Sequence, residues 1–304
     1  MKAGNAGKDV LERLVHVISE DGFTLTGCLF DSTVKPSTGL VIWVHGVSLG
    51  FAEPEYVAIG RAVAAAGVRF LSVETRGHNF GAWLRGPGGS RLAGSAWEYL
   101  AEAPMDLAPW RAFAHGLGEQ RIIMAGHGWG AAKIVFDLAE RGSDGIAGVA
   151  FASSGSLVRD QLDPSKDAEA AELVAAGKGW QLLPWGTRPG MAPNTVSAQS
   201  YARRTAIRSY LYGGLGIPPA LSKVDVPILA WFGDAEGREQ NDIADFFDRI
   251  RRDAVSAPKM HTKILHGGSF LYTGIEDQVA RHLVAWSRTV TSPRPRARSG
   301  EASR

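Results

Sequence analysis

The chain has little of what marks secreted, membrane-spanning or nucleic-acid-binding proteins. Its 304 residues include one cysteine, Cys28, so no internal disulfide can form; the apolar strand pattern around it favours a buried structural thiol. No apolar run is long enough to cross a bilayer, and residues 1–7 lack a signal-peptide core. The net charge is +2, and much of the basic excess falls in 294–298, so charge gives no reason to expect nucleic-acid binding. We therefore expect a cytoplasmic protein with no nucleic-acid or membrane partner.

Hydrophobic residues make up 45% of the chain, enough for a large core in one domain with an insertion. Strand-like and helical segments alternate, which predicts an α/β fold with a mostly parallel sheet flanked by helices. The Asp21-Gly22 pair predicts a hairpin between the first two strands. The strand-like runs are 11–18, 23–30, 39–44, 68–73, 122–125, 148–152, 227–232 and about 262–266, and the clearest helical segments are 56–66 and 275–289.

Residues 156–225 break this alternation. They hold a helical stretch at 167–176, a loop rich in tryptophan and proline, and a second helical stretch at about 197–211. A segment of this length between two strands is too long for a plain loop. We therefore predict an α/β core at 1–155 and 226–291, an inserted helical cap at 156–225, and a disordered basic tail at 292–304.

A glycine-rich turn follows the strand-like run at 122–125. It reads Gly126-His127-Gly128-Trp129-Gly130 and leads into a helix-forming segment. The spacing matches the Gly-x-nucleophile-x-Gly elbow of serine hydrolases, except that glycine stands where the serine should be. The alternative is a turn with no link to catalysis, because such turns are common. A dinucleotide fingerprint is not matched, since Ala131 stands where its last glycine should be.

Other landmarks appear in the order expected for one family, so the chain resembles the α/β-hydrolase-fold superfamily of serine esterases and thioesterases. The stretches that carry the resemblance are 44–47, 75–78, 126–130, 233–236 and 266–276. Together they cover nearly the whole chain. The resemblance implies an α/β-hydrolase fold with a cap.

The resemblance also implies roles for particular residues. The backbone N–H groups of Val47 and Trp129 would form an oxyanion hole. The catalytic acid would follow the strand that ends at Phe232, with Glu236 at the usual spacing and Asp234 as second choice.

The histidine of the family's catalytic triad is missing as well. Aligning on Tyr272 and the glycine after it puts Phe270 at the histidine position, whereas aligning on the earlier glycines puts Ser269 there. His266 stands too early in the loop to be the obvious base, although it could still enter the pocket. Losing only the serine would leave the base in place, so the loss of both residues indicates a change of role.

We expect the remaining groups to form a pocket with limited acid–base chemistry. Ser269, Phe270 and Tyr272 would line it, and Glu236 would act either as a general base or as a hydrogen-bonded structural carboxylate. His45 and His127 are interpreted as structural residues, and Ser153 and Ser154 as turn residues. No metal-ligand spacing or phosphate loop is present, so no cofactor is expected.

Three functions follow from this degenerate triad. The first is a non-hydrolytic enzyme of secondary metabolism, a cyclase, isomerase or lyase, acting on a small apolar molecule with a carbonyl, ester or lactone group. The second is an inactive pseudo-hydrolase that binds such a ligand or a protein partner. The third is an ester or thioester hydrolase in which Glu236 activates water directly. Both enzymatic functions, the first and the third, require a closed apolar cavity of about 300 Å³ or more, bounded by Val47, Gly128, Trp129, Glu236 and Phe270 and roofed by the cap.

Overall fold

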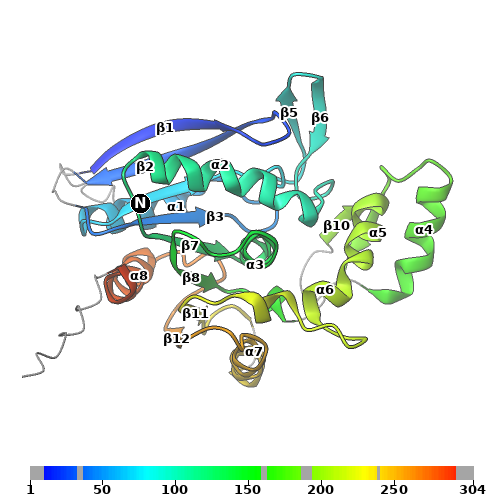
Figure 1. The fold of residues 1–304 in the computed structure, drawn as a ribbon. Coiled ribbons are helices and arrows are strands. Elements are labelled where there is room, and N and C mark those ends of the chain that lie inside the picture. The colour runs from blue at the N-terminus through cyan, green and yellow to red at the C-terminus, as the bar shows by residue number, and fades with distance from the viewer. Residues whose placement is uncertain (1–9, 33–36, 159–162, 186–193, 238–239, 292–304) are drawn as a thin grey trace, which may run out of the picture.

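The structure is a computed structural model that describes residues 10–32, 37–158, 163–185, 194–237 and 240–291. Its centre is an eight-stranded sheet in the order β1-β2-β4-β3-β7-β8-β11-β12 (Figure 1). The strands are β1 (Val10–Ile18), β2 (Thr24–Ser32), β3 (Leu40–Val44), β4 (Arg69–Val73), β7 (Ile122–His127), β8 (Ile146–Ala152), β11 (Ile228–Gly233) and β12 (Met260–Leu265). The pairings of β1 with β2 and of β2 with β4 are antiparallel, and all others are parallel. The predicted fold class and the predicted first hairpin are both confirmed.

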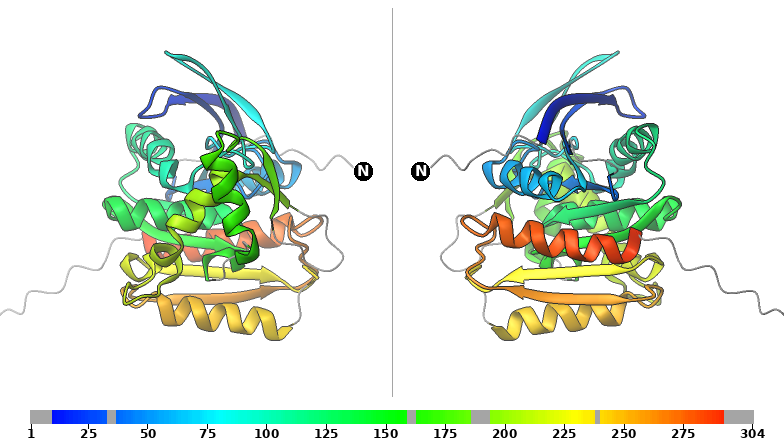
Figure 2. Two further views of the ribbon diagram at one scale, coloured as in Figure 1. Left: turned by 90° about the vertical axis from the view of Figure 1, so that its right-hand side faces the viewer. Right: turned by 90° about the vertical axis from the view of Figure 1, so that its left-hand side faces the viewer.

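Helices cover both faces of this sheet (Figures 1 and 2). One core holds side chains of the sheet, α2, α3 and α7, and the other holds side chains of the sheet, α1 and α8. Within β3, Ile42 belongs to the first core and Trp43 to the second, because successive strand residues point to opposite faces. The helices are α1 (Pro54–Ala65), α2 (Ala103–Gly116), α3 (Trp129–Arg141), α7 (Gln240–Asp253) and α8 (Glu276–Thr291).

The segment predicted to form a cap stands beside the sheet and faces the viewer in the left panel of Figure 2. It contains α4 (Asp167–Ala175), β9 (Leu182–Trp185), β10 (Asn194–Ser197), α5 (Ala198–Ala206) and α6 (Arg208–Tyr212). The sequence predicts a single helix at about 197–211. This prediction is wrong, because the chain bends at Ile207, where φ is −101° and ψ is 7°. The bend lets Leu211 of α6 pack on the main core, whereas α5 packs in a small cluster with α4. A β9–β10 hairpin adds a strand pair to the expected helices. The tail at 292–304 lies outside the described residues.

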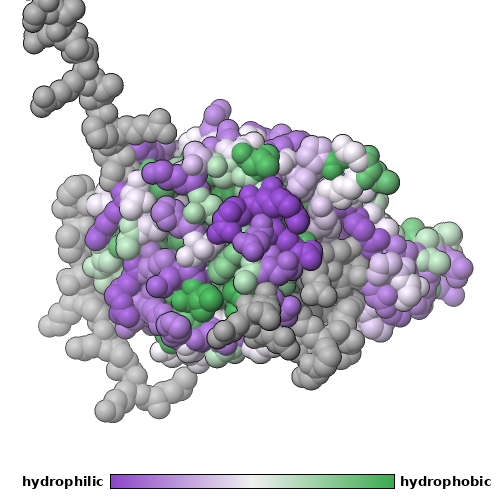
Figure 3. Space-filling view, turned by 90° about the horizontal axis from the view of Figure 1, so that it is seen from below, coloured by the Kyte–Doolittle hydropathy of each residue, from purple (hydrophilic) through white to green (hydrophobic). Residues whose placement is uncertain are grey.

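A second hairpin was also not predicted from the sequence. β5 (Ala82–Gly86) and β6 (Gly89–Ala93) pair antiparallel and project from the body of the molecule (Figure 1). The surface on the side of α7 is mostly hydrophilic, with small separate hydrophobic patches (Figure 3). Within the described residues, no helix is long and apolar enough to cross a membrane.

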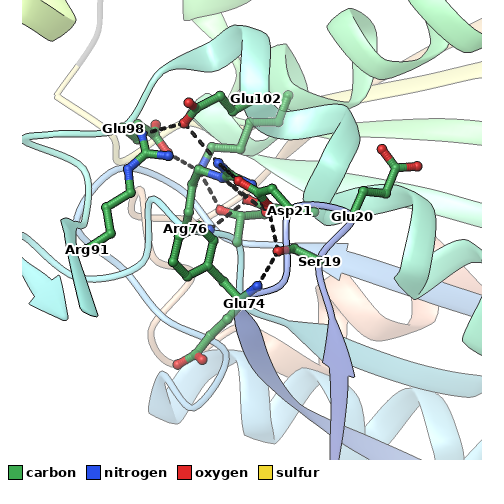
Figure 4. Close-up of polar contacts among 12 residues, drawn as sticks. Ser19, Glu20, Asp21, Glu74, Arg76, Arg91, Glu98 and Glu102 are labelled. Carbon is green, nitrogen blue, oxygen red and sulfur yellow. Dashed lines mark hydrogen bonds and ion pairs between the residues drawn. The ribbon is translucent and has the colours of Figure 1, made fainter. Parts of the chain in front are cut away.

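A buried charge cluster holds the loop after β4 against α2. The guanidinium of Arg76, 2% exposed, lies 2.8 Å from Asp106 and 2.8 Å from Asp21. It also donates to Glu102 at 2.9 Å, and Arg91 approaches the same carboxylate (Figure 4). Asp106 is fully buried and also accepts the backbone N–H of Arg76 at 2.8 Å. These contacts fix the loop that follows β4.

A second buried carboxylate, Asp137 on α3, gives a prediction about pH. Its side chain is fully buried, and burial raises its pKa to about 6, against the opposing effect of Arg111 at 3.1 Å. The unfolded chain has the lower pKa, so the stabilising contribution of Asp137 is full below about pH 4 and is lost as the pH rises toward 6. We expect Asp137→Asn, which mimics the protonated form, to raise the free energy of unfolding at pH 7.5 by about 1–3 kcal/mol.

Urea unfolding at pH 7.5 and pH 4 measures this effect, and the gain should shrink at pH 4. Asp248→Asn on the exposed face of α7 is the control and should change stability little at either pH. A loss of stability in Asp137→Asn at pH 7.5 would mean that the ion pair with Arg111 outweighs the cost of burial.

Candidate functional site

The glycine-rich turn has the geometry of a nucleophile elbow. β7 ends at His127, α3 begins at Trp129, and Gly128 between them has φ 52° and ψ −117°. The glycines on either side permit close backbone contacts. A Cβ atom on Gly126 would lie 2.4 Å from the backbone of Ala131, and one on Gly130 would lie 2.3 Å from the carbonyl oxygen of Val44. The turn therefore keeps the sharp strand-to-helix reversal of an active hydrolase.

Phe270 lies directly over the missing side chain. A Cβ atom built on Gly128 would lie 3.2 Å from Cζ of Phe270, and the three atoms nearest to it outside its chain neighbours belong to Phe270 and Gly46. The ring centroids of Phe270 and His127 are 4.3 Å apart, and Nε2 of His127 donates to the carbonyl oxygen of Phe270 at 2.8 Å. Of the two alignments of this loop, the one that puts Phe270 at the histidine position agrees with this contact.

Two buried histidines brace the turns around Gly128. Nδ1 of His127 accepts the hydroxyl of Tyr56 at 2.6 Å, and burial lowers the pKa of His127 to about 4. His45 donates from Nδ1 to the carbonyl oxygen of Gly46 at 2.9 Å and accepts the backbone N–H of Thr75 at Nε2. Burial lowers the pKa of His45 well below its usual value. Both rings are fully buried and neutral, as the structural interpretation predicts.

Glu236 lies at the end of β11 and is held by two donors. Its Oε1 accepts the backbone N–H of Gly233 at 2.7 Å and the hydroxyl of Ser153 at 2.5 Å. The hydroxyl of Tyr272 is hydrogen-bonded to the same Ser153 oxygen, so Tyr272 donates to Ser153 and Ser153 donates to Glu236. Burial keeps the pKa of Tyr272 well above its usual value, so the phenol remains a donor. A chain of hydroxyl groups thus runs from Tyr272 through Ser153 to the carboxylate of Glu236.

The sequence predicts only a turn role for Ser153. It directly follows β8, which ends at Ala152, and its φ of 52° is unusual for a residue with a side chain. Its side chain is also buried, and it joins groups from β11 and from the loop after β12. No local pattern reveals this role, because its two partners lie 83 and 119 residues away in the chain.

Ser153→Ala should therefore destabilise the protein by about 1–3 kcal/mol, because the buried hydroxyl of Tyr272 and the half-buried carboxylate of Glu236 lose a partner. Ser154→Ala is the matched control, since the hydroxyl of Ser154 bonds only to backbone oxygens. Urea unfolding of both variants gives the comparison. Equal effects would show that the hydroxyl chain contributes nothing beyond an ordinary buried serine.

Asp234 and His266 form a separate, exposed pair. Nδ1 of His266 lies 2.8 Å from Oδ2 of Asp234, and Oδ1 accepts the backbone N–H of Gly267. The side chain of His266 is 88% exposed. The hydrogen bonds of Asp234 lower its pKa, chiefly the one from His266. The structure joins these two candidates to each other at the surface.

Segment 156–225 covers both residues predicted to supply the oxyanion hole. Val47 packs against the α4–α5 cluster, whose fully buried members include Ala198 and Tyr201. The guanidinium carbon of Arg204 on α5 lies 3.8 Å from the centroid of a Trp129 ring. This segment therefore roofs the elbow. The predicted cavity beside Gly128 remains a prediction, because residues 159–162 and 186–193 of the roof lie outside the described residues.

Comparisons with solved structures give the same fold. The chain is similar to the DcsB protein in complex with a substrate analogue (14% identity, 93% of this chain and 100% of that chain, TM-score 0.68). It is also similar to the alpha/beta hydrolase GrgF from Penicillium sp. sh18 (15%, 92% and 99%, 0.64) and to Est1E from Butyrivibrio proteoclasticus bound to ferulic acid (16%, 91% and 98%, 0.61). No model of a protein family and no curated protein matches the chain. The chain has the α/β-hydrolase fold.

Proposed function

We propose that this α/β-hydrolase-fold protein is a non-hydrolytic enzyme of secondary metabolism. It binds a small apolar molecule with a carbonyl, ester or lactone group at the elbow and promotes cyclisation, isomerisation or elimination. The observation that carries the proposal is the geometry of Gly128, which keeps the backbone of a nucleophile while Phe270 lies over it. The backbone of the elbow is kept, but the side chain that would attack a substrate covalently is absent.

Covalent catalysis at the elbow lacks both the nucleophile and the base that it needs. Acyl transfer needs a hydroxyl and a base that removes its proton. Gly128 has no side chain, and the neutral ring of Phe270 accepts no proton. The ring also makes the wall above the elbow apolar, which suits a ligand with little charge.

The backbone around the elbow supports polarisation of a carbonyl group. α3 begins at Trp129, and the N-terminus of a helix stabilises developing negative charge. In hydrolases, removing one oxyanion donor costs about 3–4 kcal/mol of barrier, so a pair of donors at Val47 and Trp129 would supply much of the catalysis. The cap residues over both positions favour a site shielded from water.

One observation favours a second candidate, a pseudo-hydrolase that binds the same ligand without turnover. Glu236 accepts hydrogen bonds from Ser153 and Gly233, and the chain continues to the buried hydroxyl of Tyr272. A carboxylate held in this way is a poor general base, because removing it from these donors costs their hydrogen bonds. Glu236 therefore supports a structural role better than a hydrolysis in which it activates water.

Two measurements test the proposal. A fluorophosphonate probe followed by intact-protein mass spectrometry should give no adduct. A panel of lactones and short apolar esters should raise the melting temperature of the wild-type protein, and product analysis should show rearranged ligand. Labelling at any serine, or release of the acid, would overturn the non-hydrolytic assignment, whereas binding without rearrangement would identify the pseudo-hydrolase.

Gly128→Leu locates the binding. The new side chain would project toward Phe270, so the ligand-induced shift in melting temperature should be lost. The backbone of Gly128 lies in a region that costs other residues about 1–3 kcal/mol, and the fold should survive this loss. Gly118→Leu is the matched control, since it shares a positive φ but has open space around it. A full ligand response in Gly128→Leu would place binding elsewhere.

A further inference from the structure

A cavity of about 210 Å³ lies away from Gly128, between α5 and the chain that leads into α2. Residues 99–102 line one side of it, and Arg203 and Ala206 of α5 line the other together with Ile207, which follows α5. None of the residues predicted to bound the floor and walls of the elbow belongs to this lining, although Arg203, Ala206 and Ile207 belong to the segment predicted to roof it. The cavity therefore lies apart from the residues at Gly128.

Two hydrogen-bond donors at this cavity, Tyr99 and the exposed Arg203, have no protein acceptor among the described residues. The guanidinium carbon of Arg203 lies 3.7 Å from the ring centroid of Tyr99, and no carboxylate among the described residues pairs with Arg203. The hydroxyl of Tyr99 makes no hydrogen bond to a described residue either. Burial raises the pKa of Tyr99, so its hydroxyl is a donor at neutral pH. The Arg203 guanidinium and the Tyr99 phenol thus lie together, and no carboxylate among the described residues pairs with Arg203.

The one carboxylate in the lining is already neutralised. Oε2 of Glu102 accepts from Nη1 of Arg76 at 2.9 Å and from Nη2 of Arg91 at 2.7 Å (Figure 4). The guanidinium carbon of Arg91 also lies 5.4 Å from the centroid of Tyr99. The ring of Tyr99 therefore has two guanidinium groups beside it, and the charge of Glu102 does not cancel that of Arg203.

We propose that this cavity binds a small organic monocarboxylate with an apolar body. Arg203 would bind the carboxylate through its fork of N–H groups, and the hydroxyl of Tyr99 would donate a further hydrogen bond. Leu100, Ala206 and Ile207 would contact the apolar body. Sites for drug-sized ligands have volumes of about 300 Å³ or more, and this cavity is smaller. Its volume therefore favours a ligand of about the size of benzoate.

Binding here would tie the cap to the core. Arg203 and Arg204 are consecutive on α5, and Arg204 reaches the Trp129 ring at the elbow. A carboxylate held between Arg203 and Tyr99 joins α5 to the chain before α2 and should restrict the movement of α5 over the elbow. The site does not depend on the function proposed for Gly128.

Titration of the full-length protein with benzoate, followed by calorimetry or NMR shifts, tests this site. We expect wild-type protein to bind, Arg203→Gln to bind at least about tenfold more weakly, and Tyr99→Phe to bind a fewfold more weakly. Ile207→Trp keeps both donors but fills the cavity, and it should also abolish binding. Arg251→Gln on exposed α7 is the control and should bind like the wild type.

The other outcomes are equally informative. No benzoate binding by the wild type, or unchanged binding by Arg203→Gln, would overturn the site. Inorganic phosphate binding as tightly as benzoate would overturn the choice of an apolar carboxylate. Gly128→Leu should leave benzoate binding intact, so failure of the elbow proposal and failure of this one are distinguishable.

Discussion

Gly128→Ser combined with Phe270→His is expected to hydrolyse p-nitrophenyl esters at least about 100-fold faster than Gly128→Ser alone. The serine would occupy a backbone that already has the elbow's φ and ψ, and the new histidine would stand where the Phe270 ring now lies 3.2 Å from the serine's Cβ position. The single variant has a hydroxyl without a base. Initial rates at pH 8 give the comparison.

Ser269 supplies the matched control. Gly128→Ser with Ser269→His places the same histidine one residue away from the contact with Gly128, so this variant should be much less active. Strong turnover by Gly128→Ser alone would mean that His266 acts as the base, although its side chain is 88% exposed and bonded to Asp234. Equal activity of the two double variants would show that the position of Phe270 does not define the base.

Asp106→Ala should lower the free energy of unfolding by about 3–5 kcal/mol, a large part of the 5–15 kcal/mol of a typical domain. Asp106 is fully buried and accepts three kinds of donor from Arg76, namely the backbone N–H, Nε and Nη2. Removing its carboxylate leaves the buried guanidinium of Arg76 with only the partly exposed Asp21 and Glu102. Urea unfolding measures the loss.

Asp21→Ala is the control in the same cluster. The side chain of Asp21 is 28% exposed, so water can replace part of its interaction with Arg76, and the loss should be about 1 kcal/mol. A change of less than 1 kcal/mol in Asp106→Ala would show that Asp21 and Glu102 are sufficient to compensate Arg76.

The sheet could be predicted from the sequence because its signals are local. Runs such as 39–44 and 227–232 are apolar throughout, as expected of parallel strands buried on both faces. The β5–β6 hairpin lacks such a signal, since its strands are short and neither alternates cleanly. The bend at Ile207 is also set by packing, because it allows α6 to reach the main core.

Some features of the candidate site could be predicted from the sequence, and others could not. The elbow could be predicted because close backbone contacts demand glycine at 126 and 130, and that demand is visible in the sequence. The hydrogen bond between Ser153 and Glu236 could not be predicted, because nothing in the sequence around a serine indicates that it will contact a carboxylate 83 residues away. Sequence proximity also could not show that His266 would pair with Asp234 at the surface rather than turn inward.

The contact between Gly128 and Phe270 has a consequence for engineering the elbow one substitution at a time. A serine introduced alone at position 128 would take up a strained backbone beside an apolar ring and would have no base to remove its proton. A histidine introduced alone at position 270 would stand over a glycine with nothing to deprotonate. A selection that accepts single substitutions would therefore find no gain in ester hydrolysis at either step, so the two changes have to be made together.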